Sequence, residues 1–404
     1  MSNLLDGVRV VDFTQVISGP YATYMLARQG ADVIKLEQPG TGDQSRSMMS
    51  PSGEYGARGQ SPMFLAFNSG KRSLALDLKH PDAKEIISKL VANADVVVEN
   101  FKAGVLNRLG FGYEWAREVK PDIVYCSISG FGQVGPRAGA AAYDPVIQAT
   151  SGMMTLTGHE GVTGPTKVGF WVCDVATGMT GAFAISAALA RRGQTGEGAY
   201  IDLSMLDVAA SFISPMVTNF LNFGVEPRLM GNGSPAGSNV SSVYETKQGF
   251  IQVAAATQGQ FMAQTKAMGL ESLLEDARFN TREGRIANAD ALRVILLGRF
   301  KDEDAKTWET RLSSAGVPAG AVLTVPDMTA DSQIAERGVI QSGPAPAGLP
   351  GEFSTVGAPF IVNASRENSL PSTPSLGQHS REILAEAGYS EDRIEALFAN
   401  RAVS

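Results

Sequence analysis

Asp174 is the residue whose type and surroundings most clearly predict chemistry in this chain of 404 residues. It follows the apolar stretch VGFWVC and opens a helix-forming run, DVATGMTGAFAISAALARRG. An aspartate at a helix N-cap usually accepts backbone N–H groups of the first turn. The residues behind this one are Val, Ala, Thr and Gly, so another backbone or a ligand can approach closely. A carboxylate in apolar surroundings at the positive end of a helix can also act as a nucleophile.

Motifs for several other chemistries do not occur in the sequence. The first loop, Thr14–Pro20, has a single glycine and lacks G-x-G-x-x-G, which disfavours a dinucleotide-binding fold. There is no phosphate-binding G-x-x-x-x-G-K-[ST] and no G-x-S-x-G nucleophile motif. The three histidines, His80, His159 and His379, are not spaced as metal ligands, so no metal site is expected. The sequence therefore indicates carboxylate chemistry assisted by backbone donors.

Alternating strand and helix patterns must position this aspartate. The strands are apolar runs without alternation, which is typical of strands covered on both faces. They are expected at Val8–Phe13, Ala31–Glu37, Ser73–Leu78, Ala94–Phe101 and Ile123–Phe131, with helices at Tyr21–Gln29 and Pro81–Ala94. This order predicts an α/β fold built on a doubly wound parallel sheet.

A second, smaller α/β domain is expected after the sheet. An apolar helix over Met205–Phe223 and a Gly/Ser/Asn-rich loop, Met230–Ser242, precede two strand-like pieces and further helices around Gln258–Gly269 and Ala291–Phe300. The chain closes with a helix pair at Ser380–Ala387 and Glu391–Asn400.

Composition limits the partners and the compartment. The net charge of −7 argues against nucleic acid and anionic membranes as partners. Cys126 and Cys173 are the only cysteines and both lie in apolar runs, which favours a reducing compartment over a disulfide framework. No signal peptide is visible, and the longest charge-free apolar run, Val175–Ala190, is shorter than a membrane span. A cytoplasmic protein is expected.

An ordered series of segments resembles one family over nearly the whole chain. It begins with VRVVDFTQVISGPYATYMLARQGADVIKLEQPGTGDQSR and continues through NSGKRSLALDLKHPDAKEII and ADVVVENFKAGVLNRLGFGYE. It goes on through ISGFGQVGPRAGAAAYDPVIQATSG and CDVATGMTGAFAISAALARRGQTGEGAYIDLSM, and ends with PSLGQHSREILAEAGYSEDRI. This series resembles the class III CoA-transferases, the CaiB/BaiF family, which includes formyl-CoA:oxalate CoA-transferases and 2-methylacyl-CoA racemases.

The resemblance implies a fold, a reaction and site residues. It implies open-ring subunits threaded into an interlocked homodimer, with acyl-CoA and a small carboxylic acid as substrates and no tightly bound cofactor. It also implies a large domain that combines the N-terminal sheet with the C-terminal segment, with the small domain inserted between them. The expected boundaries are 1–200 for the N-terminal part of the large domain, 201–229 for a linker, 230–312 for the small domain, 313–340 for a second linker and 341–404 for the C-terminal part of the large domain. The resemblance places Asp174 at the family's nucleophile, which forms aspartyl anhydride and aspartyl-CoA intermediates. Residues matching CoA-contact positions are Gln15, Val16, Ile17, Ser18, Leu76, Leu78, Lys79, Asn100, Phe101 and Arg108. Leu76 and Leu78 could equally be strand core, and Lys79 and Arg108 solvated charges.

Four further positions are expected near the substrate: Tyr143, Asp144, Gly231 and Gly233. Tyr143 occupies the position of the racemase histidine, which favours a transferase over a racemase or epimerase. Ile17 replaces a glutamine of the oxalate enzyme, so oxalate is disfavoured as acceptor, and a dicarboxylate such as succinate, malate, itaconate or mesaconate is considered. The loop Met230–Ser242 is either a linker or an active-site cover, which Pro235 would stiffen. A catalytically silent acyl-CoA-binding protein is the remaining alternative.

Overall fold

The computed structural model describes residues 3–50, 52–233, 241–363 and 370–404, and the chain divides into two compact units. Unit 1 comprises residues 1–153, 167–225 and 332–404, and unit 2 comprises residues 154–166 and 226–331. Residues 201–225, predicted as part of a linker, therefore belong to unit 1. Residues 154–166, predicted within the large domain, cluster with unit 2.

Unit 1 is built on a six-stranded sheet in the order β3-β2-β1-β4-β5-β6, with every pairing parallel. Its strands are β1 (Arg9–Asp12), β2 (Asp32–Glu37), β3 (Arg72–Ala75), β4 (Val96–Glu99), β5 (Val124–Ser129) and β6 (Ala199–Ser204). The predicted doubly wound parallel sheet is confirmed, in the strand order that dinucleotide-binding folds also have, although the first loop lacks their glycine motif. The missing motif concerns one loop, whereas the topology follows from the chain order of buried strands.

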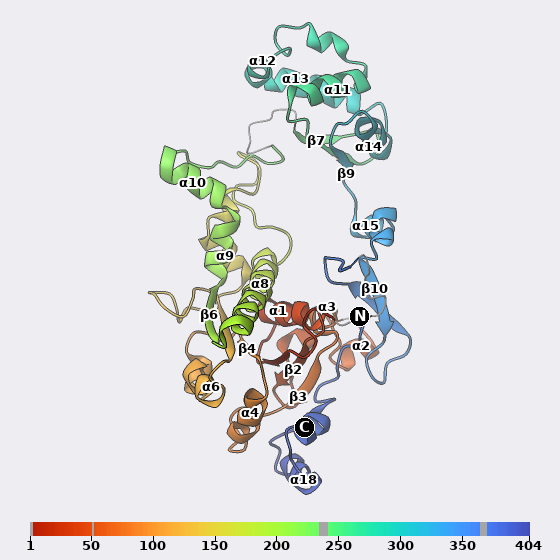
Figure 1. The fold of residues 1–404 in the computed structure, drawn as a ribbon. Helices are drawn as coiled ribbons and strands as arrows, with labels where there is room; N and C mark the ends of the chain where they lie inside the picture. Colours follow the sequence, from red (N-terminus) through yellow and green to blue (C-terminus); the bar gives the residue numbers. More distant parts are fainter. Residues whose placement is uncertain (1–2, 51, 234–240, 364–369) are drawn as a thin grey trace. The chain divides into compact units, whose positions relative to one another are not determined.

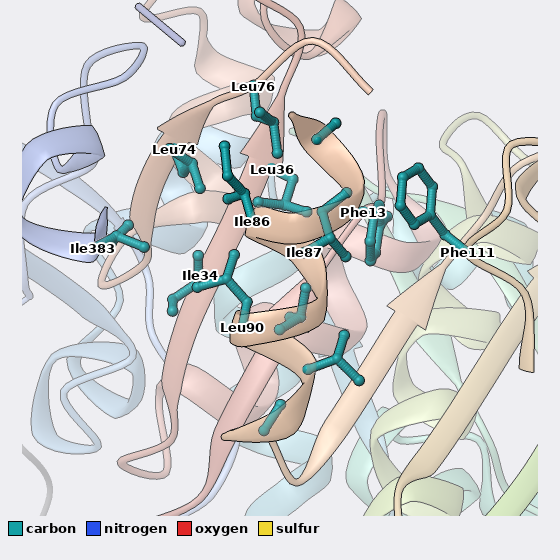
Figure 2. Close-up of a cluster of buried hydrophobic side chains, with 14 of the residues drawn as sticks. Phe13, Ile34, Leu36, Leu74, Leu76, Ile86, Ile87, Leu90, Phe111 and Ile383 are labelled. Carbon is teal, nitrogen blue, oxygen red and sulfur yellow. The ribbon is translucent and has the colours of Figure 1, made fainter. Parts of the chain in front are cut away.

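Apolar side chains alternate between the two faces of this sheet and build two cores. On one face, α4 (Ala83–Ala92), α6 (Tyr113–Val119), α17 (Ser380–Glu386) and α18 (Glu391–Ala399) cover the strands. Figure 2 shows this core, with Ile86, Ile87 and Leu90 of α4 beside strand side chains such as Ile34 and Leu36. On the other face, α1 (Ser18–Ala27), α8 (Val172–Thr195) and α9 (Met205–Phe212) pack over Val10, Val96 and Ile128.

The remaining helices of unit 1 connect these layers or lie at their margins. They are α2 (Glu54–Ala57), α3 (Pro62–Asn68), α5 (Val105–Arg108), α7 (Asp144–Thr150), α10 (Ser214–Phe223) and α16 (Ser332–Glu336). The predicted single helix over Met205–Phe223 is in fact two, because Pro215 in the first turn of α10 has no N–H to continue the preceding helix. The strand predicted over Ser73–Leu78 ends at Ala75, since residues 77–80 form a turn with the His80 N–H on the Asp77 carbonyl at 3.0 Å.

The C-terminal segment returns to the edge of the large sheet. It carries the hairpin of β10 (Ile340–Pro344) and β11 (Glu352–Val356) and then the helix pair α17 and α18. The Ser404 N–H donates to the Ala75 carbonyl at 3.1 Å, and Val403 forms a bridge with Leu76. Residues more than 300 positions apart therefore share one core.

Unit 2 is a separate α/β unit around its own core. Three short antiparallel strands, β7 (Ser242–Glu245), β8 (Phe250–Val253) and β9 (Ala319–Ala321), form its sheet. Its helices are α11 (Gln258–Met268), α12 (Arg282–Ala287), α13 (Ala289–Phe300), α14 (Ala305–Ser314) and α15 (Val325–Thr329). Trp308 is fully buried at the centre, with its indole N–H donating to the Phe300 carbonyl at 2.9 Å.

Helix α8, which carries Asp174, packs over one face of the sheet (Figure 1). Within the described ranges it is the one helix long and apolar enough to cross a membrane by length and composition, with 24 residues. The charge-free run Val175–Ala190, which the sequence analysis compared with a membrane span, is only part of this helix. Its buried face packs against α1 and the sheet, as expected of the core helix of a folded unit.

Candidate active site

Asp174 lies in the first turn of α8, as its third residue. The sequence placed it at the N-cap, but the helix begins two residues earlier, at Val172, and Trp171 precedes it. Asp174 therefore does not cap its own helix. Since α8 precedes a strand of the parallel sheet, its first turn lies at the edge where the strands end, which is where α/β folds bind ligands.

The carboxylate of Asp174 is buried and faces the N-terminus of a second helix. Ser18, the first residue of α1, donates hydrogen bonds to it from both its hydroxyl and its backbone N–H. Burial raises the pKa of Asp174 to about 7, and the negative charge of Asp144 acts in the same direction, while the two Ser18 bonds oppose the rise. Asp174 is thus a carboxyl group that ionises near neutral pH between two helix N-termini.

Glycine allows these two helices to meet so closely. A Cβ atom on Gly178 would lie 2.8 Å from the Ser18 carbonyl oxygen and 2.9 Å from the Tyr21 Cβ atom. A Cβ atom on Gly181 would lie 3.3 Å from the Cβ of Ala22. The prediction that the small residues behind Asp174 admit another backbone is confirmed, and that backbone belongs to α1.

Asp144 supplies the cap that Asp174 does not. One of its carboxylate oxygens accepts the N–H groups of Cys173 at 2.7 Å and of Asp174 at 3.1 Å. The other accepts the side-chain amide of Gln148 at 2.6 Å. Asp144 is buried, so its charge acts on Asp174 with little screening by solvent. This residue was predicted near the substrate, and the structure places it against the helix turn that carries Asp174.

The loop from Gln15 to Ile17 leads into Ser18 at the switch point between β1 and β4. The side chain of Asn100 grips the main chain of Gln15, accepting its N–H at 2.8 Å and donating to its carbonyl at 2.7 Å. Val16 has a φ of 70°, in the left-handed region that β-branched residues rarely adopt. The predicted residues of the first loop, Gln15 to Ser18, are thereby brought together with Asn100, which was predicted from a separate segment.

The other predicted CoA-contact residues follow β3 and β4 at the same edge of the sheet. Leu76 is 0% exposed and packs within the sheet core, and Leu78 and Phe101 pack against that core while partly exposed. For the Leu76 side chain the structure therefore supports the core alternative. Lys79 and Arg108 are exposed cations. Their roles toward CoA stay predictions.

The residues predicted near the substrate are divided between the two units. Tyr143 directly precedes α7 and is 64% exposed, with its backbone carbonyl accepting the N–H groups of Val146 and Ile147. Gly231 belongs to unit 2, where its N–H donates to the Gly158 carbonyl at 2.8 Å. Gly233 also lies in unit 2, while residues 234–240 of the predicted cover loop, Pro235 included, lie outside the described residues. Among the described residues, no group of three or more His, Cys, Asp or Glu is arranged to hold a metal ion.

Sequence reasoning missed the buried charges that surround this loop. Lys35 and Asp43 are fully buried, and neither was singled out. Lys35 interrupts an apolar strand, VIKLE, at a position whose neighbours are all buried. A lysine is rarely buried without a partner, so this placement is the signal that could have been noticed.

Comparisons with known proteins point to one family. The family model of CoA-transferase family III matches residues 5–380. A succinate–glutarate CoA-transferase of Agrobacterium fabrum is 37% identical over 95% of this chain and 95% of its own length. A succinyl-CoA:mesaconate CoA-transferase of Haloarcula marismortui is 36% identical over 95% of this chain and 96% of its own.

A solved structure also matches. The crystal structure of a CaiB/BaiF family protein from Brucella suis has a TM-score of 0.83 and 35% sequence identity, and the match covers 96% of this chain and 100% of that one. The family resemblance read from the sequence motifs is therefore confirmed. Given a family model that spans nearly the whole chain and relatives that align with it end to end, this chain belongs to CoA-transferase family III.

Proposed function

We propose that this enzyme transfers CoA from a dicarboxylic acyl-CoA donor such as succinyl-CoA to a small dicarboxylic acid, with Asp174 as the covalent carrier. One observation carries the mechanism: a buried carboxylate at two helix N-termini, hydrogen-bonded by Ser18 and able to ionise near neutral pH. The names of the relatives, which pair succinyl-CoA or succinate with glutarate or mesaconate, support the substrate class.

The first half of the reaction moves CoA onto the enzyme. The ionised Asp174 carboxylate attacks the thioester carbonyl, the carbon–sulfur bond breaks, and CoA thiolate leaves a mixed anhydride on Asp174. The thiolate then attacks the aspartyl carbonyl carbon of this anhydride. The donor acid departs as its carboxylate, and Asp174 is left as an aspartyl-CoA thioester. No proton is gained or lost in either step.

The second half repeats these steps in reverse order with the acceptor. The acceptor carboxylate attacks the aspartyl thioester and releases CoA thiolate, giving a second mixed anhydride. The thiolate attacks the acceptor's carbonyl and releases the Asp174 carboxylate. Each attack on the aspartyl carbon creates an oxyanion within reach of the Ser18 donors, a role worth about 3 kcal/mol for a well-aimed donor.

The raised pKa of Asp174 suits this chemistry. A carboxylate with a pKa of about 7 is a stronger nucleophile, once ionised, than one with an ordinary pKa. It also leaves less readily from the anhydride than a common carboxylate does, which prolongs the covalent state. CoA is proposed to bind at the loops after β1, β3 and β4. The exposed cations Lys79 and Arg108 would bind its phosphates.

We also propose that the active form is a cytoplasmic, interlocked homodimer, as the family resemblance implies. Helix α10 has no buried residue in the single chain, and it exposes Phe220, Leu221 and Phe223. Phe183 of α8 is exposed as well. Exposed apolar side chains on these helices support a subunit interface that covers them.

The substrate proposal is tested with purified enzyme and a matrix of donors and acceptors. Succinyl-CoA, acetyl-CoA and formyl-CoA are each incubated with glutarate, mesaconate, itaconate, malate and oxalate, and the CoA esters are identified by mass. Succinyl-CoA with a dicarboxylate of four or five carbons should give the highest kcat/KM. Preference for formyl-CoA with oxalate, or transfer only to monocarboxylates, would refute the substrate class.

A racemase or epimerase would remove the proton beside the thioester, which needs a base poised near neutral pH. Tyrosine side chains in general are protonated at neutral pH, so the tyrosine at the racemase histidine position, Tyr143, is a poor candidate for that base. With a chiral 2-methylacyl-CoA in deuterated water, the proposal predicts negligible deuterium at the alpha carbon during transfer. Rapid exchange that is lost in Tyr143→Phe would favour the racemase instead.

A further inference from the structure

The turn that delivers Ser18 to Asp174 is strained. Val16 adopts a φ of 70°, and a β-branched residue in this region costs about 1–3 kcal/mol and persists only when its surroundings hold it there. Ile17 follows and is buried, and Ser18 then opens α1. The conformation at Val16 therefore decides where the two Ser18 donors point.

Two buried charged side chains hold this turn through its main chain. The Lys35 ammonium donates to the Thr14 carbonyl at 2.7 Å, just before the strained residue. One carboxylate oxygen of Asp43 accepts the Val16 N–H at 3.0 Å. The other lies 2.8 Å from the Lys35 ammonium, so one ion pair bridges two of the turn's attachment points.

The pair is buried at a cost, and its partners keep both members charged. Both side chains are 0% exposed. Burial would lower the pKa of Lys35, but the charges of Asp43, Asp12 and Glu37 together outweigh it, and the pKa lies above its ordinary value. Burial would raise the pKa of Asp43, and the charge of Lys35 together with hydrogen bonds from Ser45 and Val16 holds it below its ordinary value.

A buried ion pair rarely adds stability compared with apolar residues of the same size, and its best-attested use is to fix one arrangement among several. Here the arrangement is a turn that its own sequence disfavours. We propose that Lys35 and Asp43 are positioning residues that hold the Val16 turn in the conformation that aims the Ser18 donors at Asp174. This inference rests on the proposed role of Asp174 as nucleophile.

The test avoids leaving one buried charge without its partner, which costs about 3–5 kcal/mol and could unfold the chain. The double variant Lys35→Met/Asp43→Asn removes both charges at similar side-chain volume. Adding Val16→Gly to it supplies a residue that adopts a positive φ without steric strain. Leu397→Ala, a core truncation in α18, is the control for general destabilisation.

In the double variant we expect kcat to fall at least tenfold with a smaller change in KM. The acid limb of the kcat profile should also move to higher pH, because weakened Ser18 bonds no longer lower the pKa of Asp174. The other groups facing Asp174 are Asp144 of α7 and Cys173 of its own helix, and both are unchanged. The triple variant should regain most of the lost kcat. The control should lose stability without moving the limb.

A second readout does not depend on catalysis. The difference in Tm between each protein and its Asp174→Asn counterpart, followed from pH 4 to pH 9, reports the pKa of Asp174 by linkage. An unmoved acid limb and an unchanged Tm difference in the double variant, or no recovery on adding Val16→Gly, would overturn the positioning role. Full activity of Asp174→Asn would instead refute the nucleophile, and the Tm series would still decide whether the turn sets the environment of Asp174.

Discussion

At the scale of single residues, the environment of Asp174 is a balance between burial and hydrogen bonding. Burial and the charge of Asp144 favour the protonated acid, whereas the Ser18 donors favour the carboxylate, and the pKa settles at about 7. Because this value exceeds that of an unfolded aspartate, the folded protein binds the proton more tightly than the unfolded chain does. Asp174 therefore costs stability as pH rises from about 4, and the cost is fully present above about pH 7.

Asp174→Asn should abolish transfer and stabilise the protein at alkaline pH. The amide keeps an acceptor for Ser18 and removes the buried charge, so the stability gain should be near zero at pH 4 and reach roughly 2–4 kcal/mol at pH 8. Thermal unfolding of both proteins across this range measures it. A variant that is equally or less stable than the parent at pH 8 would contradict the buried, charged Asp174.

Asp144→Asn should make Asp174 more acidic. It removes the like charge beside Asp174, so the acid limb of the kcat/KM profile should move down by about one pH unit. Weaker capping of α8 should cost about 1 kcal/mol of stability. Asp202→Asn, which removes a carboxylate bonded to the Gln133 N–H instead, is the matched control and should leave the limb in place.

The sequence singled out Asp174 and Asp144 as candidate site residues, but it did not predict the hydrogen bond between the Asp174 N–H and the Asp144 carboxylate. The small residues that follow Asp174 can be read directly from the sequence, and so can the ordered set of family motifs. The start of α8 was misjudged because the capping group comes from Asp144, 30 positions earlier, and is local only in space. The Ser18 bonds and the strain at Val16 likewise depend on contacts between separate elements.

At the scale of elements, the close packing of α1 against α8 sets the distance between Ser18 and Asp174. Gly178→Ala should separate the helices, since its Cβ would lie 2.8 Å from a backbone oxygen that cannot easily move. We expect kcat to fall tenfold or more and stability to drop by about 1–3 kcal/mol. Gly193→Ala, at an open position near the end of the same helix, is the control and should raise helix stability slightly. Equal activity of the two variants would contradict this packing argument.

The strands and the order of elements were largely predictable, because apolar runs without alternation indicate a parallel sheet covered on both faces. The residues at which helices and strands begin and end were less predictable. Pro215 splits the helix predicted over Met205–Phe223, and a turn shortens the strand predicted over Ser73–Leu78. Both follow from local backbone chemistry that apolar periodicity does not report.

At the scale of the whole molecule, the exposed apolar side chains of α10 support the proposed homodimer. Size-exclusion chromatography with light scattering should give twice the chain mass at micromolar concentration. The double variant Leu221→Glu/Phe223→Glu should lower activity and weaken the dimer, because it places charges in an apolar interface. Its mass in the same measurement should fall toward that of one chain, or the protein should aggregate. A fully active monomer at all concentrations would contradict the homodimer.

The return of the C-terminal segment to β3 could not be derived from periodicity, because it joins residues more than 300 positions apart. The family resemblance supplied it instead. The division into two units, with residues 154–166 and 226–331 in the second, likewise depends on contacts between segments far apart in the sequence. Long-range contacts carry little local signal.

The most direct test of the account is to trap the carboxyl group that carries the acyl chain. Hydroxylamine added during turnover with succinyl-CoA and an acceptor acid should convert an activated carboxyl to a hydroxamate, which peptide mapping by mass spectrometry locates. The account predicts a hydroxamate on Asp174 that depends on acyl-CoA and is lost in Asp174→Asn. A label on another carboxylate, or none while transfer proceeds, would contradict covalent catalysis by Asp174.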